Sequence, residues 1–505
     1  MIPMPLSYIA EKLNGRLDGH DDTVDHVFTD SRIDSKDLVD KQALFVALKG
    51  PNFDAHKFVE NIQGKGARAA LVEKVQASEI PQIIVSDTRL ALAKIAHLNR
   101  QKSRAKYIAV TGSSGKTTVK EMIASILSLS GKTLATKGNL NNDIGAPLTL
   151  LAVDQSIDYA VIELGANHVG EIAFTANLVQ PDVALVNNVS AAHLQGFGDL
   201  QGVAKAKAEI YFSLLESGTA IVNADDEFSE FFSTQVSNKK IEYSISALSG
   251  LEEDKSNASC SASQVLTPRI TATQISRQTD QSSSFVLNAN GEQVQINLPL
   301  IGTHNVANAL AAASCCFALD IPMQQIAKGL AQAPVVAGRL VVNELSNSCR
   351  VIDDTYNANL ASMKAAIDLL GQYPVPRILV VGDMAELGDK SKQLHEEMGS
   401  YALKAGISKL FCCGPLSRFT EQGFVEKQAS NSENTKNLVT KQTADHFAQK
   451  SELIIKLKKE AKAGTTILVK GSRSSKMENV VKALVEFSDE SLSSGSNHAL
   501  LGEAQ

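Results

Sequence analysis

The sequence has no apolar run long enough to span a membrane and no cysteine spacing typical of a metal site. No stretch reaches the roughly 18 to 20 apolar residues that a span needs, and no basic segment precedes an apolar one near Met1. The six cysteines include two adjacent pairs, Cys315-Cys316 and Cys412-Cys413, and lack any C-x-x-C arrangement. We therefore expect a cytoplasmic protein with reduced thiols.

The chain also lacks an excess of basic residues and an internal repeat of fixed period. Its 49 Lys and Arg against 55 Asp and Glu give a formal net charge of −6, which argues against a broad nucleic-acid surface. Local basic groups must then meet any anionic ligand. With 505 residues, 44% of them hydrophobic, the chain has material for about three domains. We expect a monomer with no nucleic-acid partner and no membrane span.

Three α/β regions follow one another along the chain. Residues 1–104 alternate helical and strand segments irregularly, which predicts a small mixed α/β domain. Residues 105–334 repeat apolar strands separated by helices, which predicts a central, doubly wound and mostly parallel sheet. Residues 335–487 show a second α/β pattern, which predicts a Rossmann-like C-terminal domain. The Ser-, Gly- and Glu-rich residues 488–505 are expected to form a disordered tail.

The central region contains a segment of different composition. Between Leu248 and Ser282 the chain is rich in Ser, Thr, Gln and Asp, which predicts a solvated loop. Apolar residues then flank Asn290-Gly291, a pair that favours a tight β-hairpin turn. We therefore expect a small antiparallel insert after this loop.

A strand, a glycine-containing turn and a helix follow one another from Tyr107. The turn is Thr111-Gly112-Ser113-Ser114-Gly115-Lys116-Thr117-Thr118. Its N–H groups and the helix N-terminus converge on anionic oxygens, Lys116 adds a mobile positive charge, and the Thr117 hydroxyl can bind Mg²⁺. The first glycine of a standard phosphate loop would fall at Val110, so an ordinary Gly/Ser turn is the alternative. The flanking strand and helix favour a nucleoside triphosphate site.

Polar residues also follow neighbouring strands of the predicted parallel sheet, where ligands bind. Glu163 ends one strand, and Asn187-Asn188 and His193 follow the next. A carboxylate and an imidazole beside a triphosphate are suitable Mg²⁺ ligands, although singly each is more often a surface group. The segment 137–145 is either a simple loop or a site for a sugar or peptide, because three of its side chains both donate and accept hydrogen bonds: Asn139, Asn141 and Asn142.

Several motifs, taken together and in their order along the chain, resemble those of the ATP-dependent Mur ligases of peptidoglycan synthesis. The resemblance covers nearly the whole chain, and the short phosphate loop fits the family well. Besides that loop, the motifs that carry it are Asp30-Ser31-Arg32, Asn139-Leu140-Asn141-Asn142-Asp143-Ile144-Gly145, Glu163-Leu164-Gly165-Ala166, Ala192-His193-Leu194, Ala206-Lys207-Ala208-Glu209-Ile210, Gly302-Thr303-His304-Asn305-Val306-Ala307-Asn308-Ala309, Gly338-Arg339, Asp353-Asp354-Thr355-Tyr356-Asn357-Ala358-Asn359, Gly382-Asp383-Met384-Ala385-Glu386-Leu387-Gly388 and Lys470-Gly471-Ser472-Arg473.

The resemblance implies a division of work among the domains. The first would hold the UDP end of a substrate, the central one ATP and the growing peptide, and the last the incoming amine. The expected substrates are UDP-N-acetylmuramoyl-tripeptide, D-alanyl-D-alanine and ATP, with Mg²⁺ as cofactor. The tripeptide and the dipeptide would be joined through an acyl phosphate intermediate. The tetrapeptide Asp-Asn-Pro-Arg of the diaminopimelate- or lysine-adding sibling is absent, which favours the dipeptide-adding member. The alternatives are a folylpolyglutamate synthase and, from another class, a nucleotide-dependent switch or motor.

The resemblance also implies roles around the nucleotide. The seven residues from Gly112 to Thr118 would hold the phosphates of ATP. Asn305 and Asn308, one helical turn apart, would contact adenine, with helix capping as the alternative. Arg339 would reach the terminal phosphate and Asp354 the ribose. The implied catalytic residues are Lys116, Lys207, His193 and Arg339, and the implied Mg²⁺ ligands are Thr117, Glu163, His193 and a carbamylated Lys207.

A further set of residues would contact the other substrates by the same resemblance. Asp30, Ser31 and Arg32 would meet the uridine diphosphate, with a plain polar turn as the alternative. The dipeptide carboxylate favours a cation, and the residues implied for the peptide substrates are Asn139, Asn141, Asn142, Tyr356, Asn357, Lys470 and Arg473. The chain departs from the family at Leu360, where many members have proline after Asn359.

Overall fold

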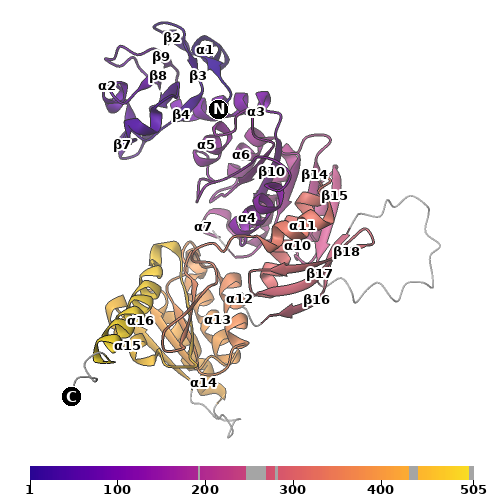
Figure 1. The fold of residues 1–505 in the computed structure, drawn as a ribbon, viewed down its shortest axis with the longest axis vertical. Helices are drawn as coiled ribbons and strands as arrows, with labels where there is room; N and C mark the ends of the chain where they lie inside the picture. Colours follow the sequence, from indigo (N-terminus) through magenta and orange to yellow (C-terminus); the bar gives the residue numbers. More distant parts are fainter. Residues whose placement is uncertain (192–193, 246–268, 279–281, 432–441, 500–505) are drawn as a thin grey trace, which may run out of the picture.

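The computed structural model describes residues 1–191, 194–245, 269–278, 282–431 and 442–499, and three larger sheets follow one another along the molecule (Figure 1). In that view the N-terminal part lies at the top and the C-terminal part at the bottom. The predicted three-domain α/β fold class is confirmed, while its boundaries after residues 104, 334 and 487 stay predictions. Within the described ranges, no helix has the length and apolar character that a bilayer crossing requires.

The N-terminal sheet has strand order β2-β9-β8-β5-β4, and β5 (Ala43–Val46) is buried on both faces. Leu44 and Val46 belong to one apolar core and Ala43 and Phe45 to another, because successive side chains of a strand point to opposite faces. The other elements are β1 (Met4–Pro5), α1 (Leu6–Leu13), β2 (Arg16–Asp18), β3 (Thr23–Val24), β4 (His26–Phe28), β6 (Lys49–Gly50), β7 (Phe53–Asp54), α2 (Val59–Gln63), β8 (Ala67–Val72), β9 (Gln82–Ile84) and α3 (Thr88–Lys102).

The central sheet has nine strands in the order β11-β12-β10-β13-β14-β15-β16-β17-β18. The strands from β11 to β16 pair in parallel, and β16, β17 and β18 pair antiparallel. Its elements are β10 (Lys106–Thr111), α4 (Lys116–Leu127), β11 (Thr133–Ala135), α5 (Gly145–Leu151), β12 (Tyr159–Glu163), α6 (Glu171–Val179), β13 (Val183–Val186), α7 (Leu194–Phe197), α8 (Leu200–Ala208), β14 (Thr219–Asn223), α9 (Ser229–Gln235), β15 (Lys239–Ser244), β16 (Arg269–Arg277), β17 (Ser283–Ala289), β18 (Glu292–Leu298), α10 (Thr303–Phe317) and α11 (Met323–Ala331).

The antiparallel part contains the predicted hairpin, but a strand replaces part of the loop that was expected before it. Asn290 and Gly291 join β17 to β18 with φ values of 48° and 85°, the left-handed pair that a type I′ turn needs. Strand β16, however, lies within the segment expected as a loop. Its buried Ile270 and Ala272 alternate with polar residues, so the polar composition concealed a half-buried strand. Most of the remaining segment lies outside the described residues.

The C-terminal sheet has six strands in the order β19-β20-β24-β21-β22-β23, parallel except for the edge strand β19. The cysteines that the structure describes are buried and free. The elements are β19 (Val341–Glu344), β20 (Arg350–Asp354), α12 (Leu360–Gly371), β21 (Arg377–Val381), α13 (Ser391–Lys404), β22 (Lys409–Cys413), α14 (Arg418–Asn431), β23 (Thr443–Phe447), α15 (Lys450–Glu460), β24 (Thr466–Lys470) and α16 (Glu478–Ala499).

The C-terminal end differs from the expected disordered tail, because α16 continues to Ala499. Ser488 is buried, and its hydroxyl accepts a hydrogen bond of 2.8 Å from the Ser346 N–H, which attaches the helix to the loop between β19 and β20. A helix satisfies its backbone groups within the segment itself, so Ser- and Gly-rich composition did not decide the state of residues 488–499. Residues 500–505 lie outside the described residues.

Apolar contacts join the central domain to the C-terminal one. Leu194 and Phe197 of α7 and Val203 of α8 belong to the same core as Met384 and Leu387 of the C-terminal domain. These contacts place the segment after β20 beside the turn after β10, which is where the candidate site lies.

Helix α11 packs closely against α4 at Gly329, where an added Cβ would lie 2.4 Å from the Ile126 Cα. We expect Gly329→Ala to lower the Tm, because overpacking of this kind costs about 1 to 3 kcal/mol. Differential scanning calorimetry would measure the change. Gly371→Ala is the matched control, since its new Cβ would meet its nearest atom, Ala405 O, at 3.7 Å. Equal Tm values for both variants would contradict the close contact.

Candidate active site

The turn between β10 and α4, residues 112–115, is held by side chains that follow β13. The Ser114 N–H donates to Asn188 Oδ1 at 2.8 Å, and Ser114 O accepts hydrogen bonds from Asn187 Nδ2 at 3.0 Å and Asn188 Nδ2 at 3.1 Å. The Ser113 N–H donates to Asn188 O at 3.0 Å. Both asparagines lie at the end of a parallel strand, as predicted, but their hydrogen bonds to the turn could not be predicted from the sequence.

Gly115 allows α10 to approach the same turn. Its φ of 78° lies in the left-handed region, and an added Cβ would lie 2.5 Å from Asn308 Oδ1 and 2.6 Å from Asn187 Nδ2. Asn308 Oδ1 accepts from Asn187 Nδ2 at 3.0 Å, and Asn308 Nδ2 donates to Asn305 Oδ1 at 3.1 Å. Asn305 and Asn308 therefore share one helical face, and this face is buried against the turn.

Positive charge gathers at this turn. Lys116 Nζ donates to Gly112 O at 2.8 Å, and desolvation lowers the Lys116 pKa, with Glu163 acting in the opposite direction and Arg339 lowering it further. Lys207, on α8, is 3% exposed. Its burial, and then the nearby charge of Lys116, lower the pKa of Lys207 well below the ordinary value for a lysine. A site with this surplus of cations suits a polyanionic ligand.

Glu163 presents an unpaired carboxylate oxygen to the site. Its Oε1 accepts from Asn141 Nδ2 at 2.8 Å, and its N–H donates to Thr136 Oγ1 at 3.0 Å. Its Oε2 is buried and has no hydrogen-bond partner among the described residues. An unpaired buried anionic oxygen is costly, so this position fits a hard cation such as Mg²⁺. His193, the expected second ligand, lies outside the described residues.

No cluster of three His, Cys, Asp or Glu side chains forms a metal site within the described ranges. Proteins usually hold Mg²⁺ with one or two carboxylates, substrate phosphates and water. Glu163 and Thr117 therefore fit a cation that a nucleotide brings with it.

Arg339 reaches the turn from the C-terminal domain. Its Nη2 donates to Thr117 Oγ1 at 3.0 Å, and its guanidinium carbon lies 4.3 Å from the centre of the Tyr356 ring. This stacking orients the planar cation, while Arg339 Nε is buried without a partner among the described residues. The arrangement leaves the Nε–H group available to an anionic acceptor such as a phosphate oxygen.

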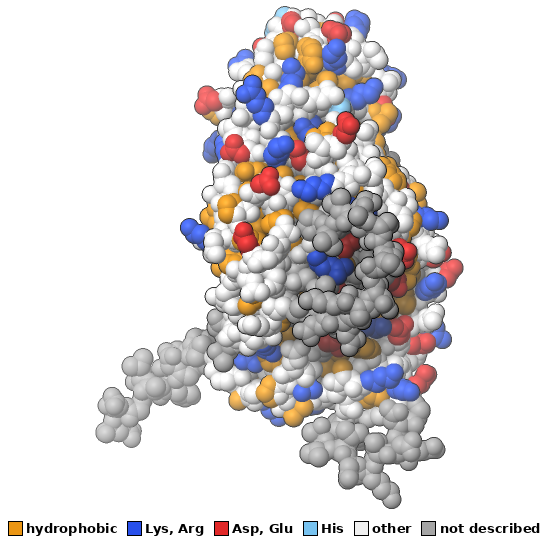
Figure 2. Space-filling model, turned by 90° about the vertical axis from the view of Figure 1, so that its right-hand side faces the viewer, with side chains coloured by type: hydrophobic (Ala, Val, Ile, Leu, Met, Phe, Trp, Pro, Cys, Tyr) orange, Lys and Arg blue, Asp and Glu red, His pale blue; other side chains and the backbone are white. Residues whose placement is uncertain are grey.

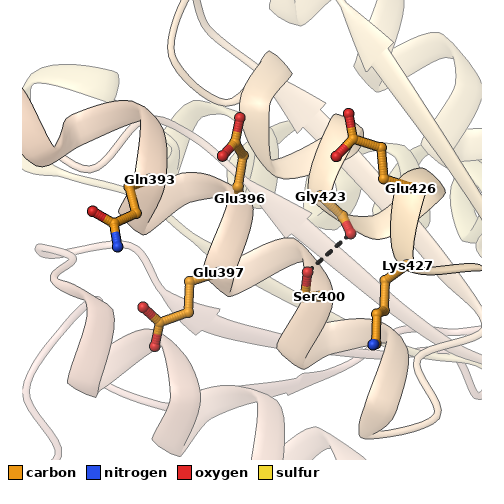
Figure 3. A pocket seen from close by; sticks show the side chains of 7 residues that line it. All are labelled: Gln393, Glu396, Glu397, Ser400, Gly423, Glu426 and Lys427. Carbon is orange, nitrogen blue, oxygen red and sulfur yellow. Dashed lines mark hydrogen bonds between the residues drawn. The ribbon is translucent and has the colours of Figure 1, made fainter. Parts of the chain in front are cut away.

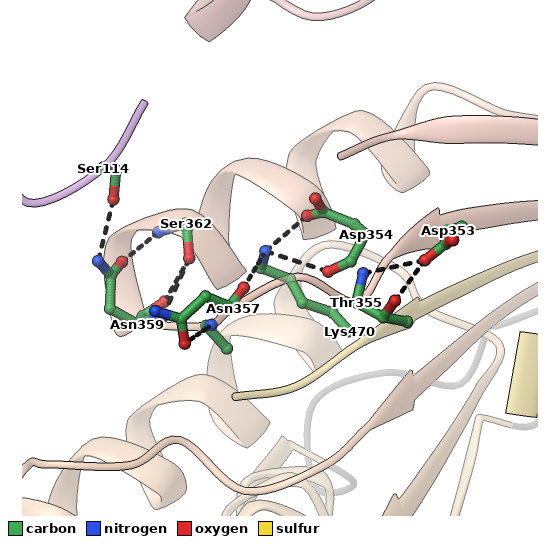
Figure 4. Close-up of polar contacts among 9 residues, drawn as sticks. Ser114, Asp353, Asp354, Thr355, Asn357, Asn359, Ser362 and Lys470 are labelled. Atoms are coloured by element: carbon green, nitrogen blue, oxygen red, sulfur yellow. Dashed lines mark hydrogen bonds and ion pairs between the residues drawn. The ribbon is translucent and has the colours of Figure 1, made fainter. Parts of the chain in front are cut away.

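The buried Lys470 forms an ion pair with the partly exposed Asp354 (Figure 4). Lys470 Nζ lies 2.6 Å from Asp354 Oδ2 and donates to Asn357 O at 2.9 Å. Lys470 of β24 thus holds the segment that follows β20, and its ammonium group is engaged with protein oxygens. Tyr356 and Asn357, expected to act with Lys470 on the dipeptide, lie on this segment.

The residues expected to bind UDP lie elsewhere, on the turn after β4 in the N-terminal domain. Arg32 donates to Asp30 through Nη2 at 2.7 Å and through Nε at 2.9 Å. The hydrogen bonds from the Arg32 side chain and N–H lower the pKa of Asp30 to about 2. Lys65 Nζ donates to Ser31 O at 2.8 Å and so supports the turn. The Arg32 side chain is 88% exposed and accessible to a ligand.

Three more of the expected site residues contact residues close to them in the sequence or are exposed to solvent. Asn142 Oδ1 accepts from the N–H of Gly145, the first residue of α5, at 2.8 Å. Asn139 is exposed, and Arg473 Nη1 lies 3.2 Å from Glu478 Oε1 at the surface. Asn141 is the member of the asparagine loop that contacts the site, through Glu163.

Acidic and basic side chains are interspersed over the face shown in Figure 2. A hollow between α13 and α14 is lined in part by Glu396, Glu397 and Glu426 (Figure 3). Carboxylates repel phosphates, so this hollow does not suit a nucleotide.

Two family models match the chain. The Mur ligase middle domain matches residues 110–316, and the Mur ligase, glutamate ligase domain matches residues 338–473. The first match begins within β10 and includes the phosphate-loop turn. The second begins at Gly338, beside Arg339, and ends at Arg473.

Full-length relatives are also similar. The chain is 44% identical over 489 residues to the UDP-N-acetylmuramoyl-tripeptide--D-alanyl-D-alanine ligase of Escherichia coli (strain K12), covering 96% of this chain and 99% of that protein. It is 33% identical over 497 residues to the ligase of the same name from Bacillus subtilis (strain 168), covering 96% and 99%. A crystal structure of MurF from Acinetobacter baumannii aligns with a TM-score of 0.83 at 35% identity, covering 96% of this chain and 99% of that one.

The close approach at Gly115 generates a test of the site. We expect Gly115→Ala to weaken ADP binding at least tenfold, roughly the effect of a clash costing 1.4 kcal/mol or more, because the new Cβ would displace Asn187 and Asn308. Isothermal titration would measure the affinity.

Gly170→Ala provides the control, since Gly170 has a φ of 88° but no atom within 4 Å of the added Cβ. The control carries the same backbone penalty without the clash. Unchanged ADP affinity in a folded Gly115→Ala variant would refute the role given to this contact.

Proposed function

The chain belongs to the Mur ligase family, and on that premise we propose that it is an ATP-dependent ligase that joins D-alanyl-D-alanine to UDP-N-acetylmuramoyl-tripeptide in the cytoplasm. The observation that carries the proposal is its likeness, over nearly its whole length, to curated ligases of that name. The cation-rich turn at Lys116 supports ATP as the energy source. We also propose that the enzyme acts as a monomer.

The chemistry explains why such a reaction needs ATP. An amine does not displace oxide from a carboxylate at a useful rate, so the peptide carboxylate first attacks the terminal phosphate of ATP and ADP leaves. The amine of the dipeptide then adds to the acyl phosphate, loses a proton, and the tetrahedral intermediate expels phosphate to form the amide. Each step moves negative charge that fixed cations and N–H donors can stabilise.

The proposed roles of the cationic residues follow from their placement. Lys116 and the N–H groups of residues 115–118, where α4 begins, hold the β- and γ-phosphates, and Arg339 stabilises charge on the phosphate in transfer. Arg339 comes from the C-terminal domain, so phosphate transfer and closure of that domain occur together. Closure also excludes water that would hydrolyse the acyl phosphate.

Thr117, Glu163 and His193 would hold Mg²⁺, with a carbamylated Lys207 at a second ion. Bound Mg²⁺ would neutralise phosphate charge during transfer. The orphaned Oε2 of Glu163 supports this assignment. Asn141 orients that carboxylate through its hydrogen bond to Oε1.

The remaining roles are proposed by likeness and geometry together. Asn305 and Asn308 place α10 beside the adenine, and Asp354 meets the ribose. Residues 30–32 bind the uridine diphosphate, with Asn139, Asn141 and Asn142 along the peptide. Tyr356, Asn357 and Arg473 receive the dipeptide. Lys470, expected at the dipeptide carboxylate, is engaged by Asp354 and Asn357, so we assign it to holding their segment.

An assay of ADP release tests the function. We expect turnover only when UDP-N-acetylmuramoyl-tripeptide and D-alanyl-D-alanine are both present. Hydroxylamine in place of the dipeptide should trap the activated carboxylate as a hydroxamate, because it attacks acyl phosphates. Turnover with a folate substrate would favour a folylpolyglutamate synthase, and hydrolysis independent of any acceptor would favour a nucleotide-dependent switch.

The lowered pKa of Lys207 generates a separate test. Its neutral amine can add CO₂ and release a proton, which yields a carbamate beside the metal site. We expect Lys207→Ala to lose about a hundredfold in rate, the usual effect of removing a preorganised charge at the reacting centre, while the exposed Lys205→Ala variant keeps most activity. NMR with ¹³C-bicarbonate should show a carbamate signal that Lys207→Ala lacks.

The pH dependence has a definite sign. Below the lowered pKa the amine is protonated and cannot react, so the carbamate signal should fall as the pH falls and return when the pH is raised with CO₂ present. A signal that persists in Lys207→Ala, or equal losses in the Lys205 and Lys207 variants, would contradict carbamylation at this residue.

A further inference from the structure

We propose that Asn359 is a positioning residue that sets the C-terminal domain on the phosphate-binding turn, a role that rests on the proposed ligase function. Asn359 lies at the start of α12 and belongs to the C-terminal domain. Its Nδ2 donates to Ser114 Oγ at 2.9 Å and lies 3.5 Å from Ser113 O (Figure 4). The contact therefore joins the two domains directly at the turn that would hold the phosphates.

The orientation of the Asn359 amide is determined by its own helix. Asn359 Oδ1 accepts from the Ser362 N–H at 2.9 Å, and the Asn359 N–H donates to Ser362 Oγ at 3.0 Å, which is a complete capping box. With Oδ1 committed to the cap, Nδ2 must face away from α12 and toward the turn. This cap also fixes the backbone of the turn before Leu360.

Ser114 has one group left for a partner from another domain. Its N–H and its carbonyl oxygen are taken by Asn187 and Asn188 within the central domain. The hydroxyl is therefore the part of Ser114 that Asn359 contacts, and the two amides on the central side keep it in place.

A second contact lies on the other side of Lys116. Arg339 donates to Thr117 Oγ1 and stacks on Tyr356, while Lys470 holds the carbonyl of Asn357. Arg339, which stacks on Tyr356, and Asn359 thus contact the central domain at two points, Thr117 and Ser114. These two polar contacts, together with the apolar contacts at α7 and α8, define the orientation of the C-terminal domain and hence the approach of an amine held by that domain.

Asn359→Ser separates this contact from the helix cap. Serine still caps a helix but is too short to reach Ser114, so one interdomain hydrogen bond is lost. We expect kcat for dipeptide ligation to fall about five- to tenfold, the effect of a typical hydrogen bond, while KM for ATP changes less than about twofold. Steady-state kinetics would measure both constants.

Two comparisons distinguish positioning from a structural effect. Ser362→Ala removes the other half of the capping box but leaves the contact with Ser114, and it should lower kcat less than about twofold. The double variant Asn359→Ser/Ser114→Ala should lose no more than the Ser114→Ala single variant, because both changes remove the same hydrogen bond. Equal losses in Asn359→Ser and Ser362→Ala, or losses that multiply in the double variant, would overturn the proposal.

Hydrogen exchange with ADP alone separates this proposal from the proposed function. The amides of residues 113–115 should exchange faster in Asn359→Ser than in the wild type, whatever acceptor the enzyme uses. In Ser362→Ala their exchange rates should equal those of the wild type. Faster exchange without any dipeptide-dependent turnover would support the interdomain contact and refute the ligase assignment. Unchanged exchange in Asn359→Ser together with normal ligation would refute the role of the contact and support the ligase assignment.

Discussion

Gly115 fits between two amide side chains because it has no side chain of its own, and this contact determines how α4 begins. Asn187 follows β13 and Asn308 lies on α10, so segments distant in the chain close on one turn. Asn188 holds the backbone of Ser114 from the same side. The first N–H groups of a helix have no partner within it, and a turn held in this way keeps those of α4 at one place, where an anion can accept from them.

The electrostatics of the site are local. The chain carries a net charge of −6, yet Lys116 interacts electrostatically with two further cations, Lys207 and Arg339, and with one carboxylate, that of Glu163. Desolvation and mutual repulsion lower the pKa values of the two lysines, which makes bringing a polyanion into the site favourable. Burial, and then the charge of Lys116, lower the pKa of Lys207 well below the ordinary value for a lysine, whereas Lys205 of the same helix is exposed to water.

The C-terminal domain completes the site through a short segment rather than a broad surface. The Asp354–Lys470 ion pair holds the start of this segment and the capping box at Asn359 holds its end. Between them, Tyr356 supports Arg339. Rigid ends let the segment transmit the position of the whole domain to the phosphate-binding turn, which a reaction with a water-sensitive acyl phosphate requires.

Features with a local cause could be predicted from the sequence. The strand, turn and helix around Lys116 and the Asn290-Gly291 turn depend on adjacent residues, and the rule for parallel strands located Glu163. Strand β16 and the helix over residues 488–499 were missed because polar composition says little about pairing with distant segments. The bracing by Asn187, the engagement of Lys470 and the contact of Asn359 were missed for a related reason. An amide or an ammonium group has the same chemistry whether it binds a ligand or another segment of the chain, and only the tertiary structure decides which partner lies within hydrogen-bond distance.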